Sequence, residues 1–244
     1  MTLNLKPLLQ LFKTFADFVN SYRKDTYSWK GTVKQESTGV DSVLEVGCNI
    51  RPLLVNHSYS IHDGLDPDPT INQDDTRPIF TNFFNIKLEE FIPIYQYDLI
   101  ILDMVFEHLE DNSVTIDILK KSLKENGKIL IHAPSNLHPF SVLNQLIPYK
   151  LKTTLLKIFR PWSHPGDITG WKSYYNKCNI ISIEKLMKTK NMKIEKACFR
   201  YNGSDYFAFF PPFFLLVVLY EEIISFLKIS FLSSHFMLIL KHEK

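Results

Sequence analysis

Residues 43–49 read VLEVGCN, a short apolar run that ends in a glycine and is typical of a buried β-strand followed by a turn. Residues 60–66 indicate a second, weaker strand, and apolar runs at 98–102 and 128–132 indicate a third and a fourth, with helix-favouring sequence between the last two. Apolar strands that alternate with helices indicate a parallel sheet with both faces covered. The sequence therefore predicts an α/β fold, in which ligands bind at the carboxyl ends of the strands.

The composition narrows the class of protein. The chain has 244 residues, of which 45% are hydrophobic and 22% charged, as in folded globular proteins. A net charge of +2 gives the whole chain no strong attraction to nucleic acid. The three cysteines are too widely spaced for a disulfide framework or a CxxC zinc pair, and the eight histidines show no metal-binding spacing. We expect a cytoplasmic protein without a metal or a nucleic-acid partner.

A glycine and two carboxylates in the first half of the chain form the candidate ligand site. Gly47 lets a ligand approach the backbone because it has no Cβ, and Glu45 can organise the loop or meet a cationic ligand group. Asp66 lies 19 residues after Gly47, where a carboxylate can accept hydrogen bonds from both hydroxyls of a ribose. Asp63 and Asp68 compete for this role, and a solvated turn is the simple alternative.

The stretch YDLIILDMVFEHLED, residues 97–111, places Glu107 and His108 just beyond the third apolar run. α/β enzymes present side chains to their ligands at this point. His108 could act as a general base, because histidine ordinarily titrates near neutral pH. It could equally tie the loop to the sheet.

These motifs together resemble the class I S-adenosylmethionine (SAM)-dependent methyltransferases, in particular the small-molecule branch with the signature EVGCG…GxD…YDxI…EHL. The resemblance covers residues 40–136 well and continues more loosely to the end of the chain. It implies a three-layer Rossmann-like sandwich: a mostly parallel seven-stranded sheet whose last strand is antiparallel, here with lid insertions. It also implies that SAM is the cofactor and that a small-molecule, glycan-like or lipid-like acceptor receives the methyl group.

The resemblance also assigns positions to the cofactor. They are Glu45, Gly47, Cys48, Asn49, Asp66, Asn85, Asp103 and Met104. Asp66 would hold the ribose, and Asn85 corresponds to the position whose side chain usually meets the adenine amino group. Asp103 and Met104 would flank the methionine moiety.

The loop after the first strand departs from the family pattern. It reads GCNIRP at 47–52 and keeps only the first glycine of the family's GxGxG. Asn49 can still adopt a positive φ at small cost, and Arg51 with Pro52 would reshape the start of the following helix. Two rival functions follow: a catalytically silent SAM-binding scaffold, or a NAD(P)-dependent enzyme. The absence of a GxGxxG phosphate cradle argues against the second rival.

We expect one methyltransferase domain over 1–244, with an N-terminal helical segment at 1–30 and two insertions. The first insertion, 134–178, is cationic and apolar, and Pro148 would split it into two short helices. It would form a lid, or a surface for an anionic amphiphile or a membrane. The second insertion, 206–229, would be a core helix, a dimer interface or the mouth of the acceptor site.

Two further expectations concern surfaces. Residues 5–24 have helical apolar spacing and would pack on the domain, with a membrane or partner helix as the alternative. The two insertions would meet over the carboxyl ends of the strands and form the acceptor site. This site would suit an acceptor with an apolar body and an anionic or polar head. The first insertion would bring the cations Lys150, Lys157 and Arg160, and the second would bring the aromatic residues Phe209, Phe210, Phe213 and Phe214. A homodimer and a peripheral membrane location remain open.

Overall fold

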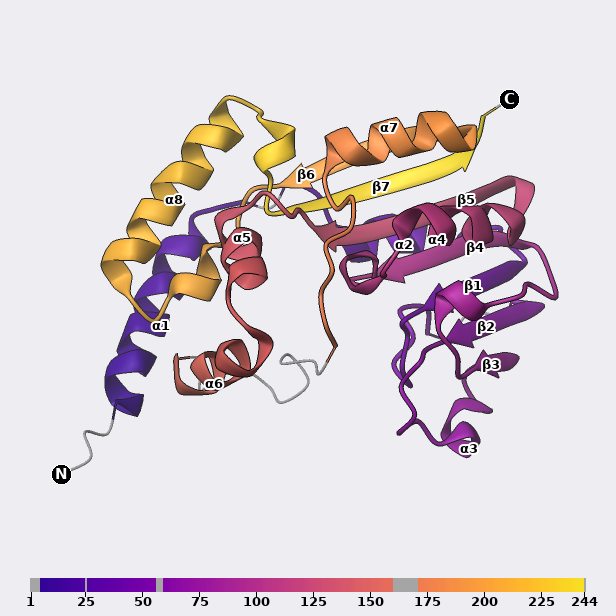
Figure 1. Cartoon of the computed structure of the whole chain (residues 1–244), viewed down its shortest axis with the longest axis horizontal. Coiled ribbons are helices and arrows are strands. Elements are labelled where there is room, and N and C mark those ends of the chain that lie inside the picture. Colours follow the sequence, from indigo (N-terminus) through magenta and orange to yellow (C-terminus); the bar gives the residue numbers. More distant parts are fainter. Residues whose placement is uncertain (1–4, 25, 56–58, 160–170, 244) are drawn as a thin grey trace.

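A single seven-stranded sheet organises the chain (Figure 1). The computed structural model describes residues 5–24, 26–55, 59–159 and 171–243. The strands are β1 (Ser42–Val46), β2 (Ile61–Leu65), β3 (Asn82–Phe84), β4 (Tyr97–Asp103), β5 (Leu123–Pro134), β6 (Met192–Arg200) and β7 (His235–His242). Their order is β3-β2-β1-β4-β5-β7-β6; β1 to β5 pair in parallel and β7 is antiparallel to both of its neighbours. The predicted fold class is therefore confirmed.

Helices cover the sheet and extend beyond it. They are α1 (Lys6–Ser21), α2 (Trp29–Glu36), α3 (Gln73–Thr76), α4 (Asn112–Lys121), α5 (Pro139–Leu146), α6 (Tyr149–Phe159), α7 (Ile180–Lys190) and α8 (Pro211–Phe226). Short 3₁₀ segments are η1 (Leu88–Glu90), η2 (Phe106–His108), η4 (Ser204–Phe207) and η5 (Ser230–Leu232). Local sequence sets several ends: the Asp111 carboxylate accepts N–H bonds at the start of α4, and Asn191 ends α7 in the left-handed conformation.

The alternation of side chains along β1 produces the three layers. Leu44 and Val46 pack into a cluster that includes residues of α4 and α7. Val43 points to the opposite face and packs against Trp29 and Val33 of α2. All five residues of β1 are buried, because helices cover both faces of the sheet. The carboxyl ends of β1, β2 and β4 therefore form a rigid edge on which a site can be built.

The connection from β1 to β2 differs from the expected pattern. No helix occurs in its described residues, 47–55 and 59–60, so the helix expected after Pro52 is wrong. The Glu45 carboxylate accepts the backbone N–H groups of Leu53 and Leu54, which holds the chain in a loop at that point. The three-residue strand β3 was also not predicted, because so short a segment leaves no periodic signal.

The two insertions contact each other, whereas their role as an acceptor site stays a prediction. In the first, α5 and α6 flank Pro148, and the ring of Phe140 stacks on Tyr206 with 3.4 Å between ring centroids. His138 Nε2 lies 3.1 Å from the Glu221 carboxylate in α8. Helix α1 packs beside α8 at the same end of the molecule (Figure 1), where a separate apolar cluster forms.

Candidate functional site

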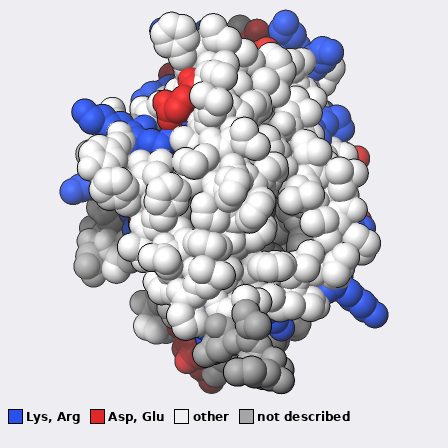
Figure 2. All heavy atoms as spheres, turned by 90° about the vertical axis from the view of Figure 1, so that its left-hand side faces the viewer, with Lys and Arg blue, Asp and Glu red and all other residues white. Residues whose placement is uncertain are grey.

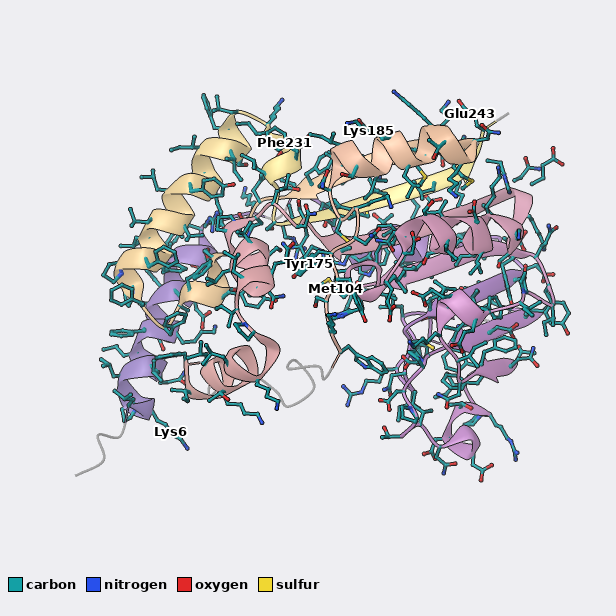
Figure 3. The ribbon with its side chains drawn as sticks, viewed as in Figure 1. Lys6, Met104, Tyr175, Lys185, Phe231 and Glu243 are labelled. Carbon is teal, nitrogen blue, oxygen red and sulfur yellow. The ribbon has the colours of Figure 1, made fainter. Side chains whose placement is uncertain are left out.

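A pocket of about 530 Å³ opens at the carboxyl ends of β1, β2 and β4. The loop after each of these strands contributes to its wall, and residues 171, 172 and 174 close another side. Met104 and Tyr175 lie near the middle of the molecule, where the chain leaves the sheet (Figure 3). The position agrees with the general rule that open α/β sheets bind ligands outside the carboxyl ends of their strands.

Gly47 is required by the geometry of the pocket floor. Its φ is +69°, and a Cβ at this position would lie 2.2 Å from Val105 Cγ2. The Gly47 N–H donates to the Leu65 carbonyl oxygen at 2.7 Å, which fixes the β1 turn against the end of β2. A side chain here would collide with the β4 loop, so the backbone itself forms the pocket surface.

Asp66 joins the loops after β1 and β2. One of its carboxylate oxygens accepts the N–H of Asn49 and the other accepts the N–H of Asp68, both at 2.9 Å. Asn49 adopts the positive φ that the sequence allowed, at +48°. Because each carboxylate oxygen has two lone pairs, Asp66 keeps accepting capacity toward the pocket that it lines.

Glu45 and Cys48 lie beneath the loop and do not line the pocket. Glu45 is buried, accepts two backbone N–H groups of the loop, and lies 2.9 Å from His62 Nε2. Burial raises the pKa of the Cys48 thiol, which keeps it neutral. We expected both residues to line the loop that binds the cofactor. In the structure they are buried behind that loop and support it from the side away from the pocket.

Asn85 also acts on the loop backbone. Its Nδ2 donates to the carbonyl oxygens of Asp66 and Asp68, each at 2.8 Å, and the residue does not line the pocket. Met104, by contrast, lines the pocket with a φ of +56° and with 37% of its surface exposed.

Asp103 contacts a histidine that the sequence interpretation missed. Its Oδ1 lies 2.7 Å from His132 Nδ1 in β5, and the two residues are register partners on adjacent strands. The His132 ring stacks on Trp29 with 5.0 Å between ring centroids, and its buried Nε2 has no hydrogen-bond partner among the described residues. The sequence carries one signal for it: a histidine within the apolar run KILIHAP, residues 128–134.

His108 lines the pocket beside a buried acid. Its Nδ1 donates to the Lys172 carbonyl oxygen at 3.0 Å, and its Nε2 lies 3.8 Å from Glu107 Oε1. Burial raises the pKa of Glu107 to about 8. The Glu107 carbonyl oxygen accepts the N–H groups of Tyr174 and Tyr175. This part of η2 therefore ties the 171–175 loop to the sheet.

A model of the family described as "Methyltransferase domain" matches residues 10–190 of this sequence. The chain belongs to this family. The predicted recognition, enzyme class and cofactor are thereby confirmed: it is a SAM-dependent methyltransferase domain.

Three solved structures share the fold of this methyltransferase. A SAM-dependent methyltransferase from Archaeoglobus fulgidus is 14% identical, with 93% of this chain and 99% of that chain covered and a TM-score of 0.53. The N-methyltransferase NodS from Bradyrhizobium japonicum WM9, in complex with S-adenosyl-L-homocysteine (SAH), is 14% identical over 88% and 86%, with a TM-score of 0.51. An O-methyltransferase from a trans-AT PKS multienzyme of Brevibacillus brevis, also with SAH, is 14% identical over 84% and 68%, with a TM-score of 0.50. The search of curated proteins gives no match.

The described residues of this methyltransferase contain neither a metal-binding cluster nor a membrane-spanning helix. Within them, no group of three or more histidine, cysteine, aspartate or glutamate side chains could hold a metal ion. No described helix has the length and apolar content needed to cross a membrane.

Proposed function

We propose that this methyltransferase binds SAM in the pocket at the ends of β1, β2 and β4 and transfers its methyl group to an amphiphilic acceptor. One observation carries the proposal. Asp66 lines the pocket beside the bare backbone of Gly47, and it follows that glycine by 19 residues, a spacing that suits a carboxylate that contacts a ribose. The loop has no GxGxxG cradle that would favour a dinucleotide.

Different pocket residues would contact different parts of the cofactor. Asp66 would accept hydrogen bonds from the ribose hydroxyls, and Asn49 would fix the loop that faces the ribose. Met104 would contact the methionine moiety. Asn85, Glu45 and Cys48 would contribute through the loop backbones that they support.

The sulfonium of bound SAM supplies an activated methyl group, so the protein has to align the acceptor and, where required, remove a proton. Asp103 is our candidate base, because it directly precedes Met104 and its side chain is 30% exposed. His132 would position that carboxylate through the 2.7 Å contact. His108 is the second candidate, since it lines the pocket itself.

The acceptor would lie where the two insertions meet. Phe140 stacks on Tyr206, and Phe159 lies 4.9 Å from Phe209 between ring centroids, so an apolar wall crosses both insertions. Phe213 is 41% exposed, whereas Phe214 is fully buried. This part of the aromatic run therefore provides both a surface and a core. Arg160, the third cation expected here, lies outside the described residues.

These features support an acceptor with an apolar body and a polar or anionic head, of the lipid-like or glycan-like class. The cationic residues Lys150 and Lys157 of α6 belong to the same insertion as the apolar wall. We further propose that 1–244 acts as one domain, with a 1–30 helical segment and insertions at 134–178 and 206–229.

Titration calorimetry separates the three candidate functions. We expect SAM and SAH to bind and NAD to give no heat. NAD binding without SAM binding would overturn the proposal in favour of a dehydrogenase. SAH binding without turnover across amphiphilic amines, alcohols and phenols would instead identify a silent scaffold, and it would leave the assignment of the pocket intact.

A further inference from the structure

Helix α8 exposes an apolar stripe that the fold does not cover. Its sequence contains no charged residue from Pro211 to Tyr220, yet the helix buries only Phe214, Val217, Glu221 and Ile224. Leu216, Leu219, Ile223 and Phe226, which follow one another at helical spacing, are 63%, 58%, 50% and 85% exposed. A helix that is apolar on nearly all sides is ordinarily buried or set in lipid.

Helix α1 exposes a matching stripe. Leu8, Leu11, Phe15, Phe18 and Tyr22 recur at helical spacing, and each has between 38% and 74% of its surface exposed. The helix contacts α8, and the Phe15 and Phe214 rings lie 6.2 Å apart in an edge-on arrangement. The two stripes are therefore parts of one surface, which we call the α1–α8 face.

The α1–α8 face continues onto the first insertion. Leu143, Leu146, Leu151 and Ile158 of α5 and α6 are 41%, 74%, 51% and 49% exposed. Figure 2 views this end of the molecule and shows a broad surface almost without charge, with lysine, arginine and some acidic side chains at its edges. An exposed apolar surface that extends over several helices ordinarily marks a site of interaction with a protein or a membrane.

The charges on these helices favour an anionic partner. Residues 139–159 contain no aspartate or glutamate, and they contain three lysines. The acids of α1 and α8 are already engaged: Asp17 pairs with Lys13, while Glu221 and Glu222 pair with Arg23. The remaining cations on the same helices and their ends include Lys24, Lys157 and Lys228. An apolar face with a cationic edge matches the acyl chains and headgroups of an anionic bilayer.

The same charges argue against a homodimer in which a second copy of the chain covers the α1–α8 face. A two-fold dimer places the same patch on both partners, so the lysine edges would face each other. Like charges that meet across an interface oppose association. The length of α8 also fits a helix that lies on a bilayer: 16 residues extend ~24 Å, less than the ~30 Å apolar core of a membrane.

We propose that the α1–α8 face binds flat on the surface of a bilayer that contains anionic phospholipids. The exposed apolar side chains of both helices enter the boundary between headgroups and acyl chains, and the lysines contact the headgroup phosphates. This membrane binding does not depend on the identity of the methyl acceptor. A soluble acceptor would leave it intact.

Vesicle flotation tests the proposal with the full chain. We expect binding to phosphatidylcholine vesicles that contain phosphatidylglycerol, weaker binding to pure phosphatidylcholine, and further weakening at high salt, because salt screens the lysine contacts. Absence of binding to the anionic vesicles would overturn the proposal.

A double variant and a matched control test whether vesicles bind at the α1–α8 face. Leu219→Ser with Phe226→Ser should weaken vesicle binding at least about tenfold, since each removes a large apolar contact. Ile92→Ser is the control: Ile92 is 81% exposed but lies in the loop before β4, and its loss should leave binding unchanged. Equal binding by all three proteins would place the contact elsewhere and contradict the proposal.

Sedimentation equilibrium tests the alternative that a second copy of the chain covers the α1–α8 face. A concentration-dependent dimer that the double variant abolishes, together with no vesicle binding, would assign the α1–α8 face to self-association and refute membrane binding. Thermal melting followed by circular dichroism should show both variants folded, because Leu219, Phe226 and Ile92 are all solvent-exposed.

Discussion

His132 Nδ1 lies 2.7 Å from Asp103 Oδ1, which links β5 to the last residue of β4, the residue that precedes the pocket-lining Met104. Because the two residues are register partners, the parallel sheet fixes their relative position. Such a contact orients a carboxylate more firmly than a loop could. The pair therefore offers a rigid proton acceptor at the point where the methionine end of the cofactor is expected.

Replacing His132 tests this role. His132→Leu should lower kcat about 10–100-fold, the scale of losing a group that orients a reactive one, with the SAH affinity unchanged. His132→Asn retains an N–H donor near the Nδ1 position and should recover most of the activity. Turnover is measured by SAH release with an acceptor found by screening. Equal kcat values for both variants and wild type would exclude a role in the chemistry.

Asp66 should dominate the affinity for the cofactor. Asp66→Ala should weaken SAH binding by about 1.5–3 kcal/mol, because hydrogen bonds to a charged group are lost. Asp68→Ala is the matched control, since that carboxylate engages only Thr70 among its described partners. Calorimetry gives both values. A larger loss in Asp68→Ala would show that the ribose contact lies two residues later.

Gly47 should tolerate no side chain. Gly47→Ala should destabilise the fold by about 2–4 kcal/mol, since the strain of a positive φ adds to the collision with Val105. Gly39 provides a matched control, because its φ is +78° and a Cβ there would meet nothing within 4 Å. Gly39→Ala should cost only about 1–2 kcal/mol and leave SAH binding intact. Urea unfolding measures both variants; equal losses would mean that Val105 moves aside.

Glu107 should make stability depend on pH. Its pKa is raised from 4.5 to about 8 by burial, so the folded state holds a proton that the unfolded state loses between these values. Stability from this group is full below pH 4.5 and falls as the pH rises toward 8. Glu107→Gln should remove this decline and gain roughly 1–3 kcal/mol at pH 8 and above. An unchanged slope of unfolding free energy against pH in the variant would contradict the assignment.

The sequence predicted the parts of the fold that local patterns determine. The run ending in Gly47 and the position of Asp66 are readable because strand, turn and spacing all lie within about 20 residues. The antiparallel last strand followed from the family resemblance, which the structure bears out.

Other features depend on contacts between distant segments. Asn85 was expected at the adenine, but the backbone of Asp66 and Asp68 takes both of its amide N–H groups. His132 was missed because its partners, Asp103 and Trp29, are 29 and 103 residues away in the sequence. No periodicity in the chain encodes such pairings, so they become visible only in the folded structure.

The contact between α1 and α8 has a consequence for the order of synthesis. Helix α1 can pack against α8 only after α8 has been synthesised, about 200 residues later. At roughly 5–20 residues per second, the nascent chain carries the apolar side of α1 unpaired for about 10–40 s. During that interval the emerging helix is a target for chaperones. If the α1–α8 face binds bilayers as proposed, the exposed side chains of α1 are available to a bilayer before the sheet has formed.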